Sequence, residues 1–259
     1  MSAAPLAGKR ILVTRPSGQA QALAALIRTA GGEPLCHPAI EIRELSDLEP
    51  FFAIADRLET FDIAVFVSRN AVERALGLLG ARRGGRPWPA ALEVAALGQG
   101  SRGELERRGL TRVLAPPAPA DSEALLALPE LAELAGKRAV IFCGEGGREL
   151  LGETLAARGA RVEYAACYRR ARPEGGAAPL LAAWSRAAVD AVTVSSGEGL
   201  ANLVEMLGGP RRLLQTALFV PHPRVAAEAA RLGVREVMVA GPGDAEMAAA
   251  LVAYFGGAR

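Results

Sequence analysis

Short apolar runs alternate with amphipathic segments along the whole chain. The apolar runs are mostly β-branched or aliphatic and are flanked by turn residues, which is typical of strands buried on both faces of a sheet. They predict strands at residues 11–14, 63–67, 94–97, 139–142, 191–194, 217–220 and 237–240. Amphipathic stretches such as 20–30, 150–158 and 225–232 predict helices between them. The alternation predicts an α/β protein with parallel sheets and crossover helices.

The pattern also repeats within the chain. The segment RILVTRPSGQAQ, which begins at Arg10, corresponds to RAVIFCGEGGRE, which begins at Arg138, at a shift of 128 residues. At the same shift Asp62 falls on Asp190, and later segments match at shifts of 124 and 123 residues. Four βα units that recur in one order predict two homologous lobes. The length of 259 residues agrees with about two domains.

Two extended segments, 34–42 and 162–170, occupy matching places after the first βα unit of each repeat. We expect them to connect the lobes, and an antiparallel pairing of the two would form a ladder between them. The Pro- and Gly-rich stretches 80–89, 116–119 and 172–179 are expected to be loops.

The composition restricts the chemistry. The chain has two histidines, His37 and His222, which are too few for a three-histidine zinc site. Three cysteines, at positions 36, 143 and 167, lack CxxC spacing, which favours free buried thiols in a reducing cytosol over disulfides. We therefore expect neither a metal site nor a disulfide framework.

The charge pattern excludes some partners. All but two of the 30 basic residues are arginine, and the formal net charge is +2. The arginine bias fits anion recognition, but we favour the base composition of the source genome as its cause. Charges of both signs are interspersed, so no basic tract indicates nucleic acid. No apolar run approaches the ~18 residues of a membrane span, and the starting MSAAPLAGKR lacks a signal-peptide core, which predicts a cytoplasmic protein.

The turns after the predicted strands carry the candidate chemistry, because ligands of doubly wound sheets bind at carboxyl strand ends. Residues 14–18 follow the first strand, and their counterpart 143–148 is glycine-rich. The counterpart lacks the third glycine of a dinucleotide fingerprint and the Gly-Lys-Ser/Thr of a P-loop. What remains is a turn into a helix whose free N–H groups favour an anion. A tight turn without a ligand is the alternative.

Similar polar turns follow the second and third strands of each repeat. Residues 68–70 and 195–197 contain Ser and Asn, which either cap the following helices or contact a ligand. Residues 98–101 and 221–224 follow the third strands. The recurrence predicts a cleft shared by both lobes. A nucleophilic triad is not expected, because there is no GxSxG elbow and His222 lacks evident Ser and Asp partners.

Tyr168, in the sequence CYRR, is the most promising candidate for proton transfer. A phenol with its ordinary pKa of ~10 stays protonated and can donate a hydrogen bond or a proton. The alternative is a half-buried aromatic side chain in the connecting ladder.

Together these motifs resemble the uroporphyrinogen-III synthase family. The resemblance rests on ILVTRP at 11–16, FVSRNAV at 66–72, the turn at 98–101, GEGGRELLGETLAARGARVEY at 144–164, YRR at 168–170, VSSGEGLANL at 194–203 and VPHPRVAAEAARLG at 220–233. It extends from about residue 10 to 254. The chain departs from the family in having serine at Ser68 and Ser195, where threonine is common. Cys143 also stands where a larger polar or basic residue is frequent.

The resemblance implies two flavodoxin-like, parallel-sheet α/β lobes joined by a two-stranded linker. Residues 1–37 would join 172–259 in one lobe, and 38–171 would form the other. The implied substrate is hydroxymethylbilane, a linear tetrapyrrole that bears eight carboxylates. The enzyme removes its terminal hydroxyl as water and closes the macrocycle with the last ring inverted, through a spiro intermediate. The family implies a monomer without a cofactor that makes transient contact with the preceding pathway enzyme.

The roles of single residues follow as hypotheses. Tyr168 would donate a proton to the leaving hydroxyl. The carboxylates would be bound, largely through backbone N–H groups, by Arg15, Ser68, Asn70, Gln99, Ser101, Gly146, Gly147, Ser196, Gly197, His222 and Arg224. Two other classes stay open: a non-catalytic two-lobed protein that binds anions or tetrapyrroles, and a nucleotide-dependent transferase. The missing phosphate motifs disfavour the transferase.

Overall fold

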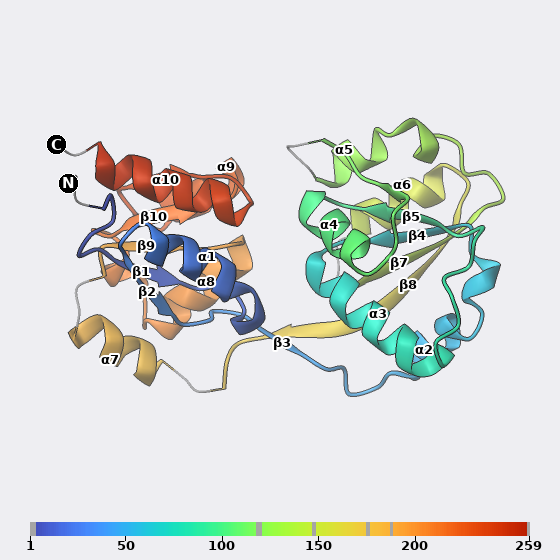
Figure 1. The fold of residues 1–259 in the computed structure, drawn as a ribbon, viewed down its shortest axis with the longest axis horizontal. Helices are drawn as coiled ribbons and strands as arrows, with labels where there is room; N and C mark the ends of the chain where they lie inside the picture. Colours follow the sequence, from blue (N-terminus) through green and yellow to red (C-terminus); the bar gives the residue numbers. More distant parts are fainter. Residues whose placement is uncertain (1–3, 118–120, 147–148, 175–176, 187–188, 258–259) are drawn as a thin grey trace. The chain divides into compact units, whose positions relative to one another are not determined.

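The computed structural model describes residues 4–117, 121–146, 149–174, 177–186 and 189–257 (Figure 1). Contacts between residues divide the chain into two compact units. Unit 1 is Met1–Glu41 with Ala171–Arg259, and unit 2 is Ile42–Arg170. The chain therefore leaves unit 1 after residue 41 and returns to it at residue 171, whereas the boundaries inferred from the sequence follow residues 37 and 171.

Unit 1 contains a five-stranded parallel sheet in the order β11-β10-β9-β1-β2. The strands are β1 (Arg10–Val13), β2 (Glu33–Cys36), β9 (Ala191–Thr193), β10 (Ala217–Val220) and β11 (Val237–Val239). The helices are α1 (Ser17–Thr29), α7 (Ala178–Arg186), α8 (Gly197–Met206), α9 (Pro223–Arg231), α10 (Asp244–Gly256) and a 3-10 turn at Pro210–Arg212. Leu12 of β1 belongs to the core under α7, α8 and α9, whereas Ile11 and Val13 belong to the core under α1 and α10. Apolar side chains thus cover both faces, as the unbroken apolar runs predict.

Unit 2 contains a six-stranded sheet in the order β3-β8-β7-β4-β5-β6, in which β8 through β6 are parallel. The strands are β3 (Glu41–Arg43), β4 (Ile63–Phe66), β5 (Glu93–Ala96), β6 (Val113–Leu114), β7 (Arg138–Gly144) and β8 (Arg161–Ala171). The helices are α2 (Glu49–Ala55), α3 (Arg69–Arg83), α4 (Gln99–Arg107), α5 (Ser122–Leu126), α6 (Glu149–Ala157) and 3-10 turns at Leu58–Thr60 and Pro129–Leu131. Phe66 packs with α2 and α3, and Val65 packs with α5 and α6.

The units share equivalent backbone anchors. Asp62 precedes β4, and its Oδ2 accepts the N–H of Arg138 at the start of β7 at 2.7 Å. Asp190 precedes β9, and its Oδ2 accepts the N–H of Arg10 at the start of β1 at 2.8 Å. In each pair the N–H of the aspartate also donates to the carbonyl of the arginine, at 2.9 Å. The 128-residue repeat is therefore matched by equivalent contacts in the two units.

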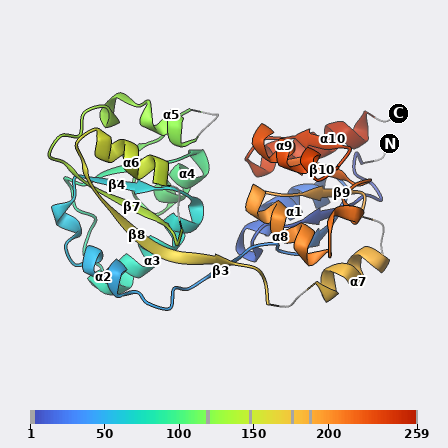
Figure 2. The same ribbon diagram turned by 180° about the vertical axis from the view of Figure 1, so that it is seen from behind.

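One expected connecting segment is divided between two strands. The beginning of 34–42 lies in β2, which pairs in parallel with β1, and its end lies in β3. Residues 162–170 lie within β8, which pairs in parallel with β7 and has β3 on its other side (Figure 2). Most of both segments therefore belongs to the sheets, because their backbone groups are hydrogen-bonded to β1 and β7.

Two of the expected loops are shorter than the sequence indicates. Helix α3 continues to Arg83, so residues 80–83 are helical, and it ends at Gly84 with a φ of 61°. Glycine adopts this left-handed conformation readily, which makes it a frequent helix terminator. Helix α7 begins at Ala178, so the end of the expected loop 172–179 is also helical. Residues 118–119 of the third expected loop lie outside the described residues.

Candidate functional site

The carboxyl ends of β4, β5 and β7 meet at one edge of the unit 2 sheet, because these strands are parallel neighbours. Three separate segments bring predicted residues to this edge, namely Ser68, Asn70, Gln99, Ser101 and Gly146. Gly147, which the sequence places beside them, lies outside the described residues. The edge also carries the amino ends of α3 and α4, where N–H groups without intrahelical partners favour anions.

Ser68 organises the first turn of α3. It is the N-cap residue, and its Oγ accepts the N–H of Ala71 at 3.1 Å. The same Oγ lies 3.1 Å from the hydroxyl of Tyr168, and either oxygen can be the donor in that contact. The sequence offered a cap and a ligand contact as alternatives for Ser68. The structure shows the cap together with a contact to Tyr168.

A β-bulge directs Tyr168 toward Ser68. Cys143 of β7 lies opposite Ala166 of β8, but the next residue, Gly144, lies opposite Tyr168, so Cys167 is an extra residue in β8. In a regular strand consecutive side chains point to opposite faces, and a bulge changes this alternation. Cys167 and Tyr168 accordingly both belong to the core under α3. The tyrosine is 2% exposed rather than half-buried.

Gly144 provides the space for the Tyr168 ring. A Cβ at position 144 would lie 2.7 Å from Cε2 of that ring, closer than side-chain carbons approach, so any larger residue here would displace the ring. Burial raises the pKa of the Tyr168 phenol above its ordinary value, while the hydrogen bond with Ser68 and the charge of Arg170 act in the opposite direction. The phenol is therefore protonated at neutral pH.

Arg69 is a further residue at this edge that sequence reasoning did not select. A Cβ on Gly100 would lie 3.2 Å from Nη2 of Arg69, so the guanidinium lies over the first turn of α4. Within the part of the chain that the structure describes, no carboxylate or carbonyl pairs with the Arg69 side chain. Its position in the sequence, between the capping Ser68 and Asn70, is the feature from which Arg69 could have been predicted. A guanidinium beside two helix amino ends strengthens the preference of this edge for carboxylates.

Gln99 and Ser101 are both engaged within unit 2. Nε2 of Gln99 donates to the carbonyl of Pro116 at 2.8 Å, which ties α4 to the segment after β6. Ser101 is 7% exposed, and its N–H donates to the carbonyl of Gly98 at 3.1 Å. The groups of α4 left for an anion are therefore the N–H groups of Gln99 and Gly100.

The carboxyl strand ends of unit 1 carry the other predicted residues, which are Arg15 after β1, Ser196 and Gly197 after β9, and His222 and Arg224 after β10. Ser196 caps α8 as Ser68 caps α3, since its Oγ accepts the N–H of Gly199 at 3.0 Å. Arg15 is engaged within the unit: Nη2 lies 3.1 Å from Oδ1 of Asp244 and donates to the carbonyl of Pro242 at 3.2 Å. Its side chain is 11% exposed, so Arg15 secures the turn between β11 and α10.

The start of α9 has few free backbone donors. His222 is its N-cap residue, Pro223 has no N–H, and the N–H of Val225 donates to the carbonyl of His222 at 3.0 Å. An anion at this turn would therefore be bound by the N–H of Arg224 and by the exposed side chains of His222 and Arg224.

Glu228 of α9 reaches the amino end of α8. A Cβ on Gly197 would overlap Oε2 of Glu228, so glycine leaves room for this carboxylate. Oε1 of Glu228 lies 3.9 Å from Nη1 of Arg224. Sequence reasoning missed Glu228, because only the contact between the two helices shows its place. A carboxylate beside α8 is what the positive end of the helix dipole favours.

The three cysteines are free, with Cys143 and Cys167 buried and Cys36 only partly so. Burial raises the pKa of the Cys143 thiol to about 11 and that of Cys167 to about 12, so neither is a ready nucleophile. Among the residues described, no group of His, Cys, Asp and Glu could hold a metal ion. No helix in the described ranges is long and apolar enough to cross a membrane.

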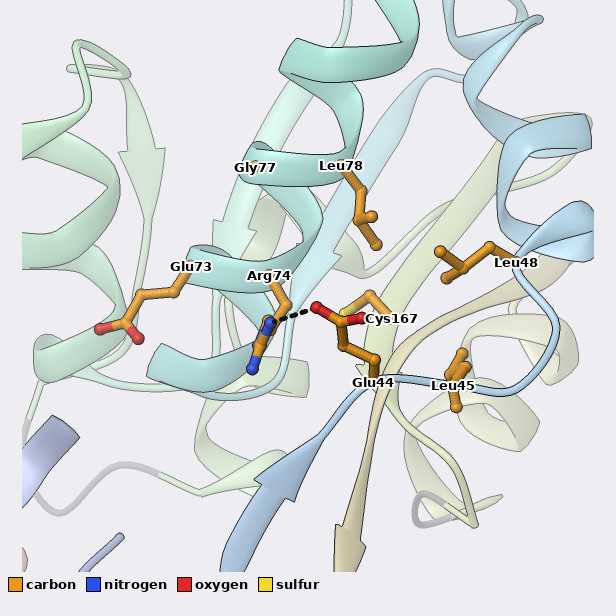
Figure 3. A pocket seen from close by; sticks show the side chains of 8 residues that line it. All are labelled: Glu44, Leu45, Leu48, Glu73, Arg74, Gly77, Leu78 and Cys167. Atoms are coloured by element: carbon orange, nitrogen blue, oxygen red, sulfur yellow. Dashed lines mark ion pairs between the residues drawn. The ribbon is translucent and has the colours of Figure 1, made fainter. Parts of the chain in front are cut away.

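A cavity of about 220 Å³ lies between α3, Cys167 and the segment that follows β3 (Figure 3). Leu45, Leu48 and Leu78 line it together with Cys167, and an ion pair of 3.6 Å joins Arg74 to Glu44 beside it. None of the predicted site residues lines this cavity.

Comparisons with known proteins agree with one another. The family model described as uroporphyrinogen-III synthase HemD matches residues 21–249. The uroporphyrinogen-III synthase of Salmonella typhimurium is 39% identical over 243 residues, which is 90% of this chain and 96% of that protein. That of Escherichia coli is 36% identical over 240 residues, again 90% and 96%. A solved uroporphyrinogen III synthase from Thermus thermophilus shares the fold, with a TM-score of 0.62 and 21% identity over 95% of this chain and 97% of that one.

Proposed function

Because the chain belongs to the uroporphyrinogen-III synthase family, we propose that its carboxyl strand ends are the groups that bind hydroxymethylbilane. The family reaction removes the terminal hydroxyl as water and closes the macrocycle with the terminal ring inverted. The resemblance inferred from the sequence is confirmed by the family match, and so is the α/β fold with parallel sheets.

Carboxylate binding is divided between the two units. In unit 2 the N–H groups at the starts of α3 and α4 bind carboxylates, and Arg69 supplies the positive charge. In unit 1 the N–H of Arg224 and the exposed side chains of His222 and Arg224 do the same, because Glu228 already lies against the start of α8. Such fixed contacts supply the positioning that the reaction needs, because the substituted carbon of the last ring must attack in place of the free position.

The hydroxyl of Tyr168 is the proposed proton donor to the leaving hydroxyl. Ser68 accepts the N–H of Ala71 and can donate its own O–H to the phenolic oxygen, which leaves the phenolic proton for the substrate. When that proton departs, the Ser68 hydroxyl stabilises the phenolate. A weak acid suffices, because the electron-rich pyrrole ring assists the departure of hydroxide.

The observation that supports the proposal best is the position of the Arg69 guanidinium beside the starts of α3 and α4. Arg69→Gln removes one charge-assisted contact, so we expect KM for hydroxymethylbilane to rise by about tenfold. Arg102→Gln is the matched control, since Arg102 pairs with Glu106 on the exposed side of α4 at 2.8 Å. Equal KM values for the two variants would contradict a role of Arg69 in substrate binding.

The reaction itself is tested with freshly prepared hydroxymethylbilane and identification of the isomer formed. Type III product is expected. The spontaneous type I product alone would indicate the non-catalytic binding protein instead.

We also propose that the protein acts as a cytoplasmic monomer that receives the bilane through transient contact with the enzyme that makes it. Sedimentation of the purified protein as a dimer would contradict the proposed monomeric state.

A further inference from the structure

A second cavity, of about 280 Å³, lies at the end of unit 2 where α3 and α4 terminate. Both helices begin at the carboxyl strand ends, so this cavity is at the opposite end of the sheet from Ser68 and Arg69. Its walls are apolar where Leu58, Leu79 and Leu110 line it. Three arginines, Arg83, Arg86 and Arg108, line the rest together with Trp88 and Gly80.

The arginines differ in what they bind. Arg83 is buried and pairs with Glu59 at 2.5 Å, and Arg108 pairs with Glu104 at 2.8 Å. Across the described ranges, the exposed side chain of Arg86 forms no hydrogen bond or ion pair. Its charge lowers the pKa of Glu59 and of Asp56 without direct contact, as a smaller contribution than the hydrogen bonds of these carboxylates with Arg83 and Arg82. A guanidinium beside an apolar cavity is therefore available to an anion.

Trp88 supplies a fixed aromatic surface. Its Nε1 donates to the carbonyl of Leu92 at 3.0 Å, and the centroid of its ring lies 6.2 Å from the ring centroid of Phe66. Trp88 is only partly buried, and it is one of the residues that line the cavity. A planar ring in the cavity would pack against an indole already held in place.

Gly80 leaves the cavity open. It lies inside α3, where glycine is less favourable than alanine, yet a Cβ there would have nothing within 4 Å. Packing therefore does not require glycine at this position. Because Gly80 lines the cavity and has open space at its Cβ, a larger side chain at position 80 is the substitution that we expect to narrow it.

We propose that this cavity binds a small planar aromatic carboxylate, with its ring between Trp88 and Leu79 and its carboxylate paired with Arg86. The apolar walls, the fixed indole and the available guanidinium are the three features that this class of ligand needs. The proposal is independent of the reaction at the strand ends, because none of these residues lies there.

Calorimetric titration with 2-naphthoate tests the proposal. We expect saturable binding to the wild type at one site, at least tenfold weaker binding to Arg86→Gln, and loss of binding in Gly80→Leu. Gly77→Leu is the matched control, since Gly77 is on the same helix, also has open space at its Cβ, and lines the other cavity. It should bind 2-naphthoate like the wild type.

The uncharged 2-naphthamide should bind at least tenfold more weakly than 2-naphthoate. Absence of saturable binding to the wild type would overturn the proposal. So would equal affinities of the wild type, Arg86→Gln and Gly80→Leu, which would place the probe elsewhere. Circular dichroism and thermal unfolding of the variants show that they are folded.

Discussion

The two units repeat one strand-end arrangement but place different side chains beside it. Ser68 and Ser196 each cap the helix that follows an inner strand, at 3.1 Å and 3.0 Å from the N–H groups they accept. The hydroxyl of Tyr168 lies 3.1 Å from Ser68. The equivalent of Tyr168 in unit 1, 128 residues earlier, is Ile40. Its side chain lies beside the first turn of α8, because a Cβ on Gly199 would be 3.6 Å from Cδ1 of Ile40. The two units thus share the capped helix starts, but unit 2 has a phenol where unit 1 has an aliphatic side chain.

The largest expected effect comes from removing the phenolic hydroxyl. Tyr168→Phe should lower kcat by about 100-fold with little change in KM, because a positioned general acid is lost while the carboxylate contacts remain. Tyr254→Phe is the control, since the Tyr254 hydroxyl donates to Glu236 in unit 1, away from the strand-end residues. Steady-state kinetics with isomer analysis provide the measurement. Full turnover and isomer purity in Tyr168→Phe would end the acid role.

The backbone anchors should differ in strength. Asp190 binds Lys9 at 3.1 Å in addition to the N–H of Arg10, whereas Asp62 is exposed and binds the N–H of Arg138. Asp190→Ala should lower the free energy of unfolding by about 1–2 kcal/mol, and Asp62→Ala by about 1 kcal/mol or less. Urea unfolding followed by circular dichroism measures both. A larger loss in Asp62→Ala would show that the two anchors are not ranked by these contacts.

The capping serines should have equal structural but unequal catalytic effects. Ser68→Ala and Ser196→Ala should each cost about 1 kcal/mol of stability through the lost cap. Ser68→Ala should also lower kcat, because the phenol loses its partner, whereas Ser196→Ala should leave kcat unchanged. Threonine at either position should restore the cap and the activity. Equal kcat values for the two alanine variants would contradict this division.

The smallest effect is an acid-dependent one confined to unit 2. Glu163 binds Arg57 at 2.9 and 2.5 Å and Arg138 at 3.2 Å, and these contacts lower its pKa to about 2. Because the pKa of Glu163 is lower in the folded state than in the unfolded state, its ion pairs stabilise the fold at pH values above the unfolded-state pKa of ~4.3. This stabilisation is lost as the pH falls from there to the folded-state pKa. The side chain is about one-third exposed, so solvent screening limits this to about 1 kcal/mol or less.

Glu163→Gln should therefore be less stable than the wild type at pH 7 and equally stable near pH 2, as measured by urea unfolding. The equivalent position in unit 1, 128 residues earlier, is Leu35, which carries no charge, so the acid-dependent effect of Glu163 has no counterpart there. Glu33→Gln, which breaks the exposed pair of Glu33 with Arg10, is the control and should change little. A wild-type-like pH profile for Glu163→Gln would contradict the role of this pair.

Most of the strand framework could be predicted, because strands buried on both faces need unbroken apolar runs. The run 63–67 became β4 (Ile63–Phe66), and 217–220 became β10 without change. The serine caps could also be anticipated, since their residue types and positions are local signals. The edge strand β2 was harder to recognise, because its half-exposed residues lack such a run.

The contacts that complete the site could not be predicted. A single extra residue at Cys167 leaves no periodic signal, yet it turns Tyr168 to the face of Ser68. Arg15, which we predict to bind carboxylates, also pairs with Asp244 far along the chain, and that contact leaves no signal in the sequence. The places of Arg69 and Glu228 depend on how neighbouring helices meet, which a single sequence does not specify.

The claim that both units bind carboxylates is tested most directly by amide NMR of the ¹⁵N-labelled protein titrated with uroporphyrin III, a stable analogue of the product. We expect shifts at the helix starts of unit 2, around Arg69 and Gly100, and also at the start of α9 in unit 1, around Arg224. Shifts confined to one unit, or absent from the strand ends of both, would contradict it.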